Sequence, residues 1–496
     1  MDDLLRRAAD LGAAYLASVD ERPVAPAVSP EALRARLDGS LPEQGSDAAA
    51  VLSWLAEAVE PGIVASAGPR YFGFVMGGSQ PVAVAADWLT SAWDQNAGLF
   101  VRSPAAAVAE EVAGSWLVEL LRLPPAVSVG FTSGGTMANF TALAAARHAV
   151  LRDAGWDVEE RGLFGAPEVQ LLAGDESHVT AYGSLQLLGL GRARATRIAT
   201  DGQGRMRGDA LAEALGRVAG PTIVAAQAGN VNTGSFDPLR DVATAIAAHR
   251  ARGHPTWFHV DGAIGLWAAA VPSLRHLVDG VELADSWTTD AHKWLNVPYD
   301  SGLVFVRDVE AHRAAMSFGG HGLVEHVPGG RDPYDFVPES SRRARGFVVL
   351  AALKALGREG LVDLVERCCG LAARMAQRLA ADPDVAILND VVLNQVLARF
   401  SPPRGSGGGT SEADIDAFTR DVIARVQGSG TLWLGGRTWH GKGVMRVSVT
   451  SWNTTETDID RSAETILRCR DEAAGEWQPE HRTGPRAFVD SRTAGD

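Results

Sequence analysis

Hydrophobic positions near the start of the chain recur at the three- and four-residue spacing of an α-helix. The positions that follow it are Leu4, Leu5, Ala8, Leu11 and Tyr15. Ser29 precedes Pro30 as a helix-starting pair, and a second helix is predicted from about Asp47 to Val59. The first 60 residues are therefore predicted to be helical.

The middle of the chain alternates short apolar runs with helical periodicity. Strands are predicted from Val127 and over 169–172, 223–226, 256–260 and 303–306, and helices over 81–93, 104–121 and 238–251 and from about Thr136. Strands separated by helices imply right-handed crossovers. The pattern predicts an α/β fold with a mainly parallel sheet.

The last third has a different pattern. Residues 307–341 are rich in Gly, Pro and charge, which predicts a long loop. A long helix over 346–380 is followed by strand-like 393–400, a Ser/Gly-rich linker 401–411, helix 412–427, strand 443–450 and helix 456–473. We expect an N-terminal helical segment (1–75), a large domain (76–345), a small α+β domain (346–475) and a disordered tail (476–496).

Composition narrows the class of protein. The 496 residues carry a net charge of −14, which argues against nucleic acid or an anionic membrane as a partner. No apolar run approaches the roughly 18–20 residues of a membrane span. The acidic Met1-Asp2-Asp3 start lacks the pattern of a signal peptide, and three cysteines show no metal-ligand spacing. We expect a cytoplasmic protein without a metal site.

Polar residues follow the predicted strands. They are His178, Asn230, Asn232, Asp261 and Lys293. In parallel sheets such residues gather in one crevice at the carboxyl ends of the strands. This shared position predicts an active site.

A glycine-rich turn precedes one predicted helix. Thr132-Ser-Gly-Gly-Thr-Met137 places two glycines and hydroxyl residues where the helix opens, so that free N–H groups and the helix dipole can bind a phosphate. Many such turns bind nothing, and this one is neither a P-loop nor a G-x-G-x-x-G motif.

Lys293 lies between His292 and Trp294, a poor setting for a solvated charge, although an isolated His-Lys pair is also typical of an exposed loop. A desolvated lysine loses its proton readily and can form a Schiff base. An anion-binding helix start, a carboxylate after a strand and a lysine 32 residues later are what pyridoxal 5′-phosphate requires.

These motifs resemble those of the group II pyridoxal-phosphate-dependent amino-acid decarboxylases, over about residues 50–473. Asp290-Ala-His-Lys-Trp294 is similar to the family's His-Lys-Trp box, and His259-Val-Asp-Gly-Ala263 to its His-Val-Asp-x-Ala box. The resemblance implies fold type I, with a mainly parallel seven-stranded sheet between helices. It also implies a homodimer with the active site at the interface, and an amino-acid substrate.

The resemblance implies a role for each motif residue. Lys293 would form the Schiff base, Asp261 would contact the pyridine nitrogen, and His178 would stack on the ring and act on the substrate carboxylate. The other cofactor-binding residues implied are Ser133, Gly134, Gly135, Thr136, Met137, Asn232, Ala263, Ser286 and His292. Which residue of the stretch around Asn232 makes the contact stays open, and Asn139 is interpreted as mainly structural.

The sequence departs from the family at one functional position. The family's mobile-loop tyrosine, which protonates the substrate carbon after CO2 leaves, has no counterpart near residues 318–323. Either Tyr334 or His321 takes this role, or the reaction is diverted to O2 and gives an aldehyde, ammonia and peroxide.

The implied activity is decarboxylation of an aromatic or acidic L-amino acid to its amine. The alternatives are oxidative decarboxylation–deamination, carbon–carbon lyase chemistry on the same scaffold, and a homologue without catalytic activity.

Overall fold

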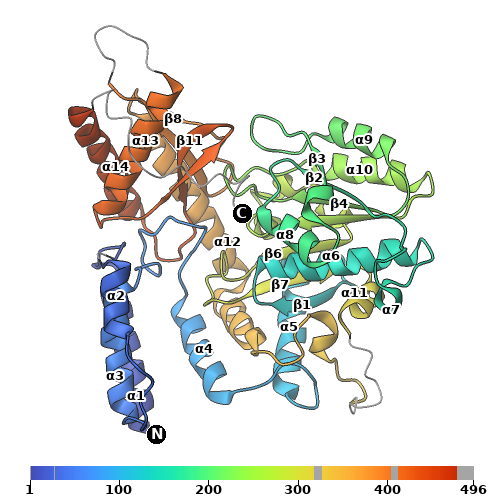
Figure 1. The fold of residues 1–496 in the computed structure, drawn as a ribbon, viewed down its shortest axis with the longest axis horizontal. Helices are drawn as coiled ribbons and strands as arrows, with labels where there is room; N and C mark the ends of the chain where they lie inside the picture. Colours follow the sequence, from blue (N-terminus) through green and yellow to red (C-terminus); the bar gives the residue numbers. More distant parts are fainter. Residues whose placement is uncertain (1, 27, 318–326, 404–410, 478–496) are drawn as a thin grey trace. The chain divides into compact units, whose positions relative to one another are not determined.

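The structure is a computed structural model, and it describes residues 2–26, 28–317, 327–403 and 411–477. These residues form two units. Unit 1 is drawn from Met1–Gly77, Arg374–Leu388 and Leu397–Asp490, and unit 2 from Gly78–Ala373 and Asn389–Val396. Each unit has its own sheet (Figure 1).

Unit 2 is built on a seven-stranded sheet with the order β1-β7-β6-β5-β4-β2-β3. The strands are β1 (Ser128–Thr132), β2 (Gln170–Gly174), β3 (Thr196–Ile198), β4 (Thr222–Gln227), β5 (Thr256–Asp261), β6 (Ser286–Asp290) and β7 (Gly302–Val306). Strands β2 to β6 pair in parallel, and β7 runs antiparallel to both β6 and β1. The predicted fold class and the mainly parallel sheet are confirmed.

Eight helices of the described residues lie wholly in unit 2. They are α4 (Pro81–Trp93), α5 (Pro104–Leu120), α6 (Gly135–Arg152), α7 (Val158–Arg161), α8 (Val179–Leu187), α9 (Gly208–Arg217), α10 (Leu239–Arg250) and α11 (Val309–Met316). Helix α12 (Arg345–Ala380) continues from unit 2 into unit 1 and breaks its helical backbone at Gly357. Short 3-10 turns occur at η1 (Glu60–Gly62), η2 (Arg192–Arg194), η3 (Leu266–Ala270), η4 (Arg275–Val278), η5 (Val281–Leu283) and η6 (Pro333–Phe336).

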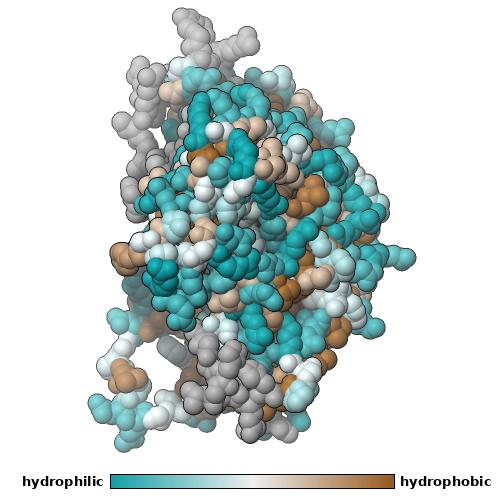
Figure 2. All heavy atoms as spheres, turned by 90° about the vertical axis from the view of Figure 1, so that its right-hand side faces the viewer, coloured by the Kyte–Doolittle hydropathy of each residue, from teal (hydrophilic) through white to brown (hydrophobic). Residues whose placement is uncertain are grey.

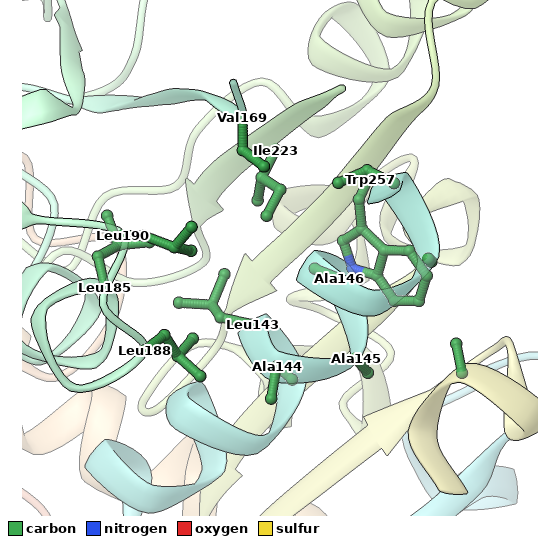
Figure 3. Packing of buried hydrophobic residues seen from close by; sticks show 14 of the residues in the cluster. Leu143, Ala144, Ala145, Ala146, Val169, Leu185, Leu188, Leu190, Ile223 and Trp257 are labelled. Atoms are coloured by element: carbon green, nitrogen blue, oxygen red, sulfur yellow. The ribbon is translucent and has the colours of Figure 1, made fainter. Parts of the chain in front are cut away.

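Helix α6 packs on one face of the sheet, against β4, β5, β6 and β7. Its buried positions are mostly alanine, which let the helix backbone approach the strands closely: Ala138, Ala142, Ala145, Ala146 and Ala149. Figure 3 shows Leu143 of α6 among Leu185, Leu188 and Ile223 in the same buried cluster. Burial of this apolar layer is what holds α6 in a fixed position over the strands.

Unit 1 contains the N-terminal helices α1 (Asp2–Ser18), α2 (Pro30–Leu37) and α3 (Ala48–Val59). Ser29 caps α2 and Asp47 caps α3, which confirms the predicted helix starts. Its sheet has the order β10-β11-β9-β8, with β8 (Val385–Ile387), β9 (Gln395–Phe400), β10 (Gly435–Trp439) and β11 (Lys442–Ser448). Helices α13 (Glu412–Gly428) and α14 (Glu456–Glu476) each begin with a capping box.

The prediction of a continuous loop over 307–341 was wrong in part. Asp308 accepts a hydrogen bond from Ala311 N and so caps helix α11, and η6 forms further on. The buried side chain of His312 fixes α11, with its Nδ1 2.8 Å from Ser128 Oγ. The Asp308 cap and the buried His312 side chain therefore stabilise a helix within a segment that is otherwise rich in glycine and proline.

Two features bear on the kind of environment that the protein's surface suits: the side chains on that surface and the apolar character of its helices. Figure 2 shows one face of the molecule, on which hydrophilic side chains predominate and hydrophobic ones are scattered. Among the helices of the described residues, none combines the length and the apolar character that a bilayer crossing needs.

Candidate active site

Several of the predicted site residues, among them Asp261, Ser286 and Lys293, lie where β5 and β6 end near the start of α6. Side chains alternate along a strand, so His259 and Asp261 of β5 point to the same face of the sheet. In the parallel register Ser286 lies opposite His259 and Thr288 opposite Asp261, so both share that face. Helix α6 covers this face, and its first turn lies beside Asp290.

The predicted phosphate turn joins β1 to α6. A Cβ at Gly302 would lie 2.5 Å from the Cα of Gly134, and a Cβ at Gly135 would lie 2.8 Å from Asp290 Oδ2, so the close packing requires glycine. The first intrahelical bond is donated by Ala138 N to Gly134 O. Within the described part of the chain, the N–H groups of Thr136 and Met137 have no acceptor, and they point out of a helix N-terminus.

Asp261 is held by two hydrogen bonds. Asn139 Nδ2 donates to Asp261 Oδ2 at 2.9 Å, and Ala263 N donates to Asp261 Oδ1 at 3.1 Å. The side chain is buried, with 6% relative exposure. Each carboxylate oxygen can accept two hydrogen bonds, so Asp261 retains the capacity to accept another from a positively charged ring N–H.

Lys293 follows β6 and pairs with the residue that ends this strand. Its Nζ lies 2.8 Å from Asp290 Oδ2, and His292 Nε2 lies 3.6 Å from Asp290 Oδ1. Burial alone would raise the pKa of Asp290, but the charges of Lys293 and His292 and the N–H of Gly135 lower it. Burial lowers the pKa of His292, against the opposing effect of Asp290. The His292 ring also lies 4.3 Å from that of Tyr299.

His178 is the N-cap of α8, and its ring is held locally. Its Nδ1 lies 2.8 Å from Thr180 Oγ1 and also accepts from Thr180 N at 3.4 Å. His178 N donates to Gln227 Oε1, and Gln227 lies opposite Asp261 in the register of β4 and β5. The start of α8 is thereby tied to the strand next to Asp261.

The described partners of Asn232 lie within its own turn, and those of Ser286 lie on the neighbouring strand β5. Asn232 is buried in a turn, where its backbone N donates to Asn230 Oδ1 at 2.8 Å. Ser286 Oγ is fully buried, 2.9 Å from His259 Nδ1, and accepts from Trp257 Nε1 at 2.8 Å. These contacts make Asn230 a turn organiser and connect Ser286 to the ring of His259.

Of the two candidate proton donors, the structure describes Tyr334 alone. Tyr334 lies in η6, where its backbone N donates to Gly98 O and burial raises the pKa of its hydroxyl. None of the contacts that the structure describes for Tyr334 includes Lys293 or Asp261. His321 lies outside the described residues. The roles that the resemblance implies for individual residues stay predictions.

Sequence reasoning gave no site role to Asn139, His259, Thr288 or Asp290. A signal for Asn139 was present, because an asparagine one turn into an alanine-rich, buried helix needs polar partners. Asp290 likewise ends a buried strand directly before Lys293, where an unpaired carboxylate would be costly.

The arrangement fits pyridoxal 5′-phosphate. The N–H groups of Thr136 and Met137 suit a phosphate, Asp261 suits a protonated ring nitrogen, and Lys293 supplies a primary amine. Asp290 Oδ1 is buried and has no hydrogen-bond partner in the described part of the chain, so a polar group is still to be accommodated beside it.

Comparisons with known proteins agree with this geometry. Residues 30–401 match the model of the pyridoxal-dependent decarboxylase conserved domain. Aromatic-L-amino-acid decarboxylase of Cavia porcellus is 30% identical over 79% of this chain and 83% of its own. 4-Hydroxyphenylacetaldehyde synthase of Rhodiola rosea is 26% identical over 85% of each chain.

The fold agrees as well. The crystal structure of Oryza sativa TDC with PLP and tryptamine superposes with a TM-score of 0.86 at 26% identity, covering 95% of this chain and 97% of that one. The predicted fold type, family and cofactor are confirmed. The chain belongs to the pyridoxal-dependent decarboxylase family, and it is a pyridoxal-phosphate-dependent carboxy-lyase of the group II amino-acid decarboxylases.

Proposed function

We propose that this enzyme removes the carboxyl group of an aromatic or acidic L-amino acid as CO2 and releases the amine. The observation that carries the proposal is the cluster of Lys293, Asp290 and Asp261 beneath the first turn of α6. When bound, pyridoxal 5′-phosphate supplies an aldehyde that reacts with amines and a ring that accepts the electrons of the broken bond.

The first task of the protein is to hold both ends of the cofactor. The N–H groups of Thr136 and Met137 bind the phosphate at the positive end of the α6 dipole. Asp261 keeps a proton on the ring nitrogen, because its buried carboxylate is a strong acceptor for a charged donor.

The second task is to place the reacting groups. Asp290 holds the amine of Lys293 at 2.8 Å, which fixes where the lysine presents Nζ to the cofactor aldehyde. His178, held through Nδ1 by Thr180, would orient the substrate carboxylate. Exclusion of water from this buried cluster strengthens each of these interactions.

A second candidate function is oxidative decarboxylation–deamination to an aldehyde. It is favoured by the position of Tyr334, whose described contacts are outside the cluster, and by the likeness to an enzyme named an aldehyde synthase. In this reaction O2 is reduced to peroxide, and the carbon that lost CO2 receives no proton from the protein.

One experiment separates the two functions. The cofactor-loaded enzyme is incubated with each standard amino acid while CO2, O2 and peroxide are followed together, with Lys293→Ala as the blank. CO2 without O2 uptake supports the decarboxylase, and CO2 with matching O2 uptake and peroxide supports the oxidative reaction. The absence of CO2 from every amino acid would contradict both.

We further propose that the enzyme is a homodimer with the active site at the interface. In unit 2, large apolar side chains remain exposed on two helices: Trp88 and Leu89 on α4, and Val108 on α5. Such a set is typical of a surface covered by another protein. Light scattering of Trp88→Glu beside the wild type tests this, and a monomeric wild type would refute it.

A further inference from the structure

The side-chain amide of Asn139 is a junction between two parts of the site. It is fully buried on α6, and its four partners come from β5, β6 and α8. The partners are Asp261 Oδ2 at 2.9 Å, His259 Nε2 at 2.9 Å, Thr288 Oγ1 at 3.0 Å and Thr180 Oγ1 at 3.4 Å. A single amide therefore bonds Asp261 directly and reaches His178 through Thr180.

The direction of the hydrogen bonds follows from Trp257 and Asp261. An indole N–H can only donate, so Trp257 Nε1 donates to Ser286 Oγ, which still has a lone pair and a proton to offer His259 Nδ1. The Asp261 carboxylate can only accept, so Asn139 turns its N–H to Asp261 and its Oδ1 to His259 Nε2, which must then carry the ring proton and leave Nδ1 to accept from Ser286. Burial lowers the pKa of His259 to about 4, so the ring is neutral near pH 7. With Nδ1 as an acceptor, the ring proton lies on Nε2 and is donated to Asn139 Oδ1.

These donors leave one orientation for the amide. Thr288 Oγ1 and His259 Nε2 both donate to Asn139 Oδ1, which directs the two N–H bonds of Asn139 away from them. A flipped amide would place its oxygen against the Asp261 carboxylate and its nitrogen against the His259 N–H, and both contacts would be repulsive.

The amide nitrogen then serves two acceptors. One N–H bond is donated to Asp261 Oδ2, and the other is directed to Thr180 Oγ1. Because Thr180 Oγ1 accepts from Asn139, its own proton is directed to His178 Nδ1 at 2.8 Å, where the longer bond from Thr180 N at 3.4 Å also ends. The proton of a neutral His178 is thereby placed on Nε2.

We propose that Asn139 is a positioning residue that fixes the Asp261 carboxylate and the His178 tautomer through the same amide group. This inference rests on the proposed function only in giving Asp261 and His178 their places beside the cofactor. Networks of this kind couple their members, since each bond in the chain sets the direction of the next.

The test combines nitrogen NMR of the cofactor-free enzyme with cofactor affinity. The enzyme is labelled with 15N-histidine, and His178 and His259 are assigned by substitution. In the wild type both rings are expected as Nε2–H tautomers. In Asn139→Ala, His178 is expected as a mixture of tautomers, and the dissociation constant for pyridoxal 5′-phosphate is expected to rise about tenfold, as loss of a hydrogen bond to a charged group predicts.

Two substitutions of Asn139 partners distinguish its connection to His178 from its connection to Asp261. Thr180→Val should disturb the His178 tautomer and change cofactor affinity less than about twofold, while Thr288→Val should weaken the cofactor severalfold and leave the His178 tautomer intact. These two variants carry the test if Asn139→Ala does not fold. Thr141→Val is the matched control, because it removes a buried hydroxyl of α6 that bonds only Met137 O among its described contacts.

The outcomes are distinct. A folded Asn139→Ala with wild-type tautomer and affinity would overturn the proposal, and so would Thr180→Val and Thr288→Val with identical effects. A Thr141→Val variant that reproduces both changes would show a general role in packing and would equally overturn it. Neither readout needs a substrate, so a failure of the proposed reaction would leave this test unaffected.

Discussion

The buried ring of His259 makes a prediction about stability in acid. Its pKa is lowered from 6.5 to about 4, chiefly by burial, while Asp261 acts in the opposite direction. The unfolded chain therefore binds a proton at this residue more tightly than the folded chain does, so folding stability is lost as the pH falls from 6.5 towards 4. The difference amounts to about 3 kcal/mol at pH 4 for this single group.

His259→Gln isolates this contribution. The amide nitrogen of glutamine can still donate to Asn139 Oδ1, but it does not titrate, and the lost bond to Ser286 costs about 1–2 kcal/mol at every pH. Urea unfolding of the cofactor-free proteins, followed by tryptophan fluorescence, is compared at steps between pH 7 and pH 4. The free energy of unfolding of the wild type should fall by about 3 kcal/mol relative to the variant.

His312→Gln extends the same reasoning to a second ring. This ring is also buried and its pKa is lowered to about 3, but it lies against Ser128 and Phe336, apart from the Asn139 junction. A His312→Gln protein should lose the contribution of His312, also about 3 kcal/mol at pH 4, and keep that of His259, and the double variant should lose both. If wild type and His259→Gln lose stability in parallel over this range, the buried neutral state of His259 is refuted.

Three further substitutions test the site and its support. Gly135→Ala places a Cβ 2.8 Å from Asp290 Oδ2, so we expect a loss of about 1–3 kcal/mol in unfolding free energy and weaker cofactor binding, measured by urea unfolding and by absorbance titration. Under the proposed function, Asp261→Ala removes the acceptor for the ring nitrogen, and kcat should fall about 10²–10³-fold in an assay of CO2 release, with an unchanged kcat as the contradicting result. Arg342→Met leaves Glu110 buried without its partner at 2.7 Å, which should cost about 3–5 kcal/mol in urea unfolding, while the double variant with Glu110→Leu should recover much of that loss.

Helix-start residues and apolar runs along the chain predicted most helices and strands of the large domain. The helix starts at Ser29, Asp47 and Pro104 follow from residue types that favour the first turn. The apolar runs identify β1, β2, β4, β5 and β7, but not β6, whose Ser286-Trp-Thr-Thr-Asp290 run is mostly polar. The reversed direction of β7 between β1 and β6 was not predictable from the same signals, because a buried strand has the same apolar run in either direction. Strand β10 escaped notice because its Gly435-Gly436 start has low strand propensity and depends on pairing with β11.

The site was predictable in its residues but not in its connections. Strand ends and the glycine-rich turn identify Asp261, Lys293 and the start of α6. A sequence does not show that Ser286 faces Trp257 and His259, since that contact depends on the register of β5 against β6. For the same reason the place of Asn139 beside Asp261 emerges only when α6 is packed on the sheet.

Helix α6 carries groups that would act on both ends of the cofactor under the proposed function. The N–H groups of Thr136 and Met137 and the amide of Asn139 lie within one turn and a half of the same helix, so their separation is set by helix geometry. The alanine face of α6 then fixes that helix against β4 to β7 with little freedom to shift. Under the proposed function, one rigid element would therefore position both a phosphate at the first turn and a ring nitrogen facing Asp261. A change that tilts α6 should therefore disturb phosphate binding and Asp261 together, whereas a change at Thr180 should act mainly on His178, since its contact with Asn139 is the longer one at 3.4 Å.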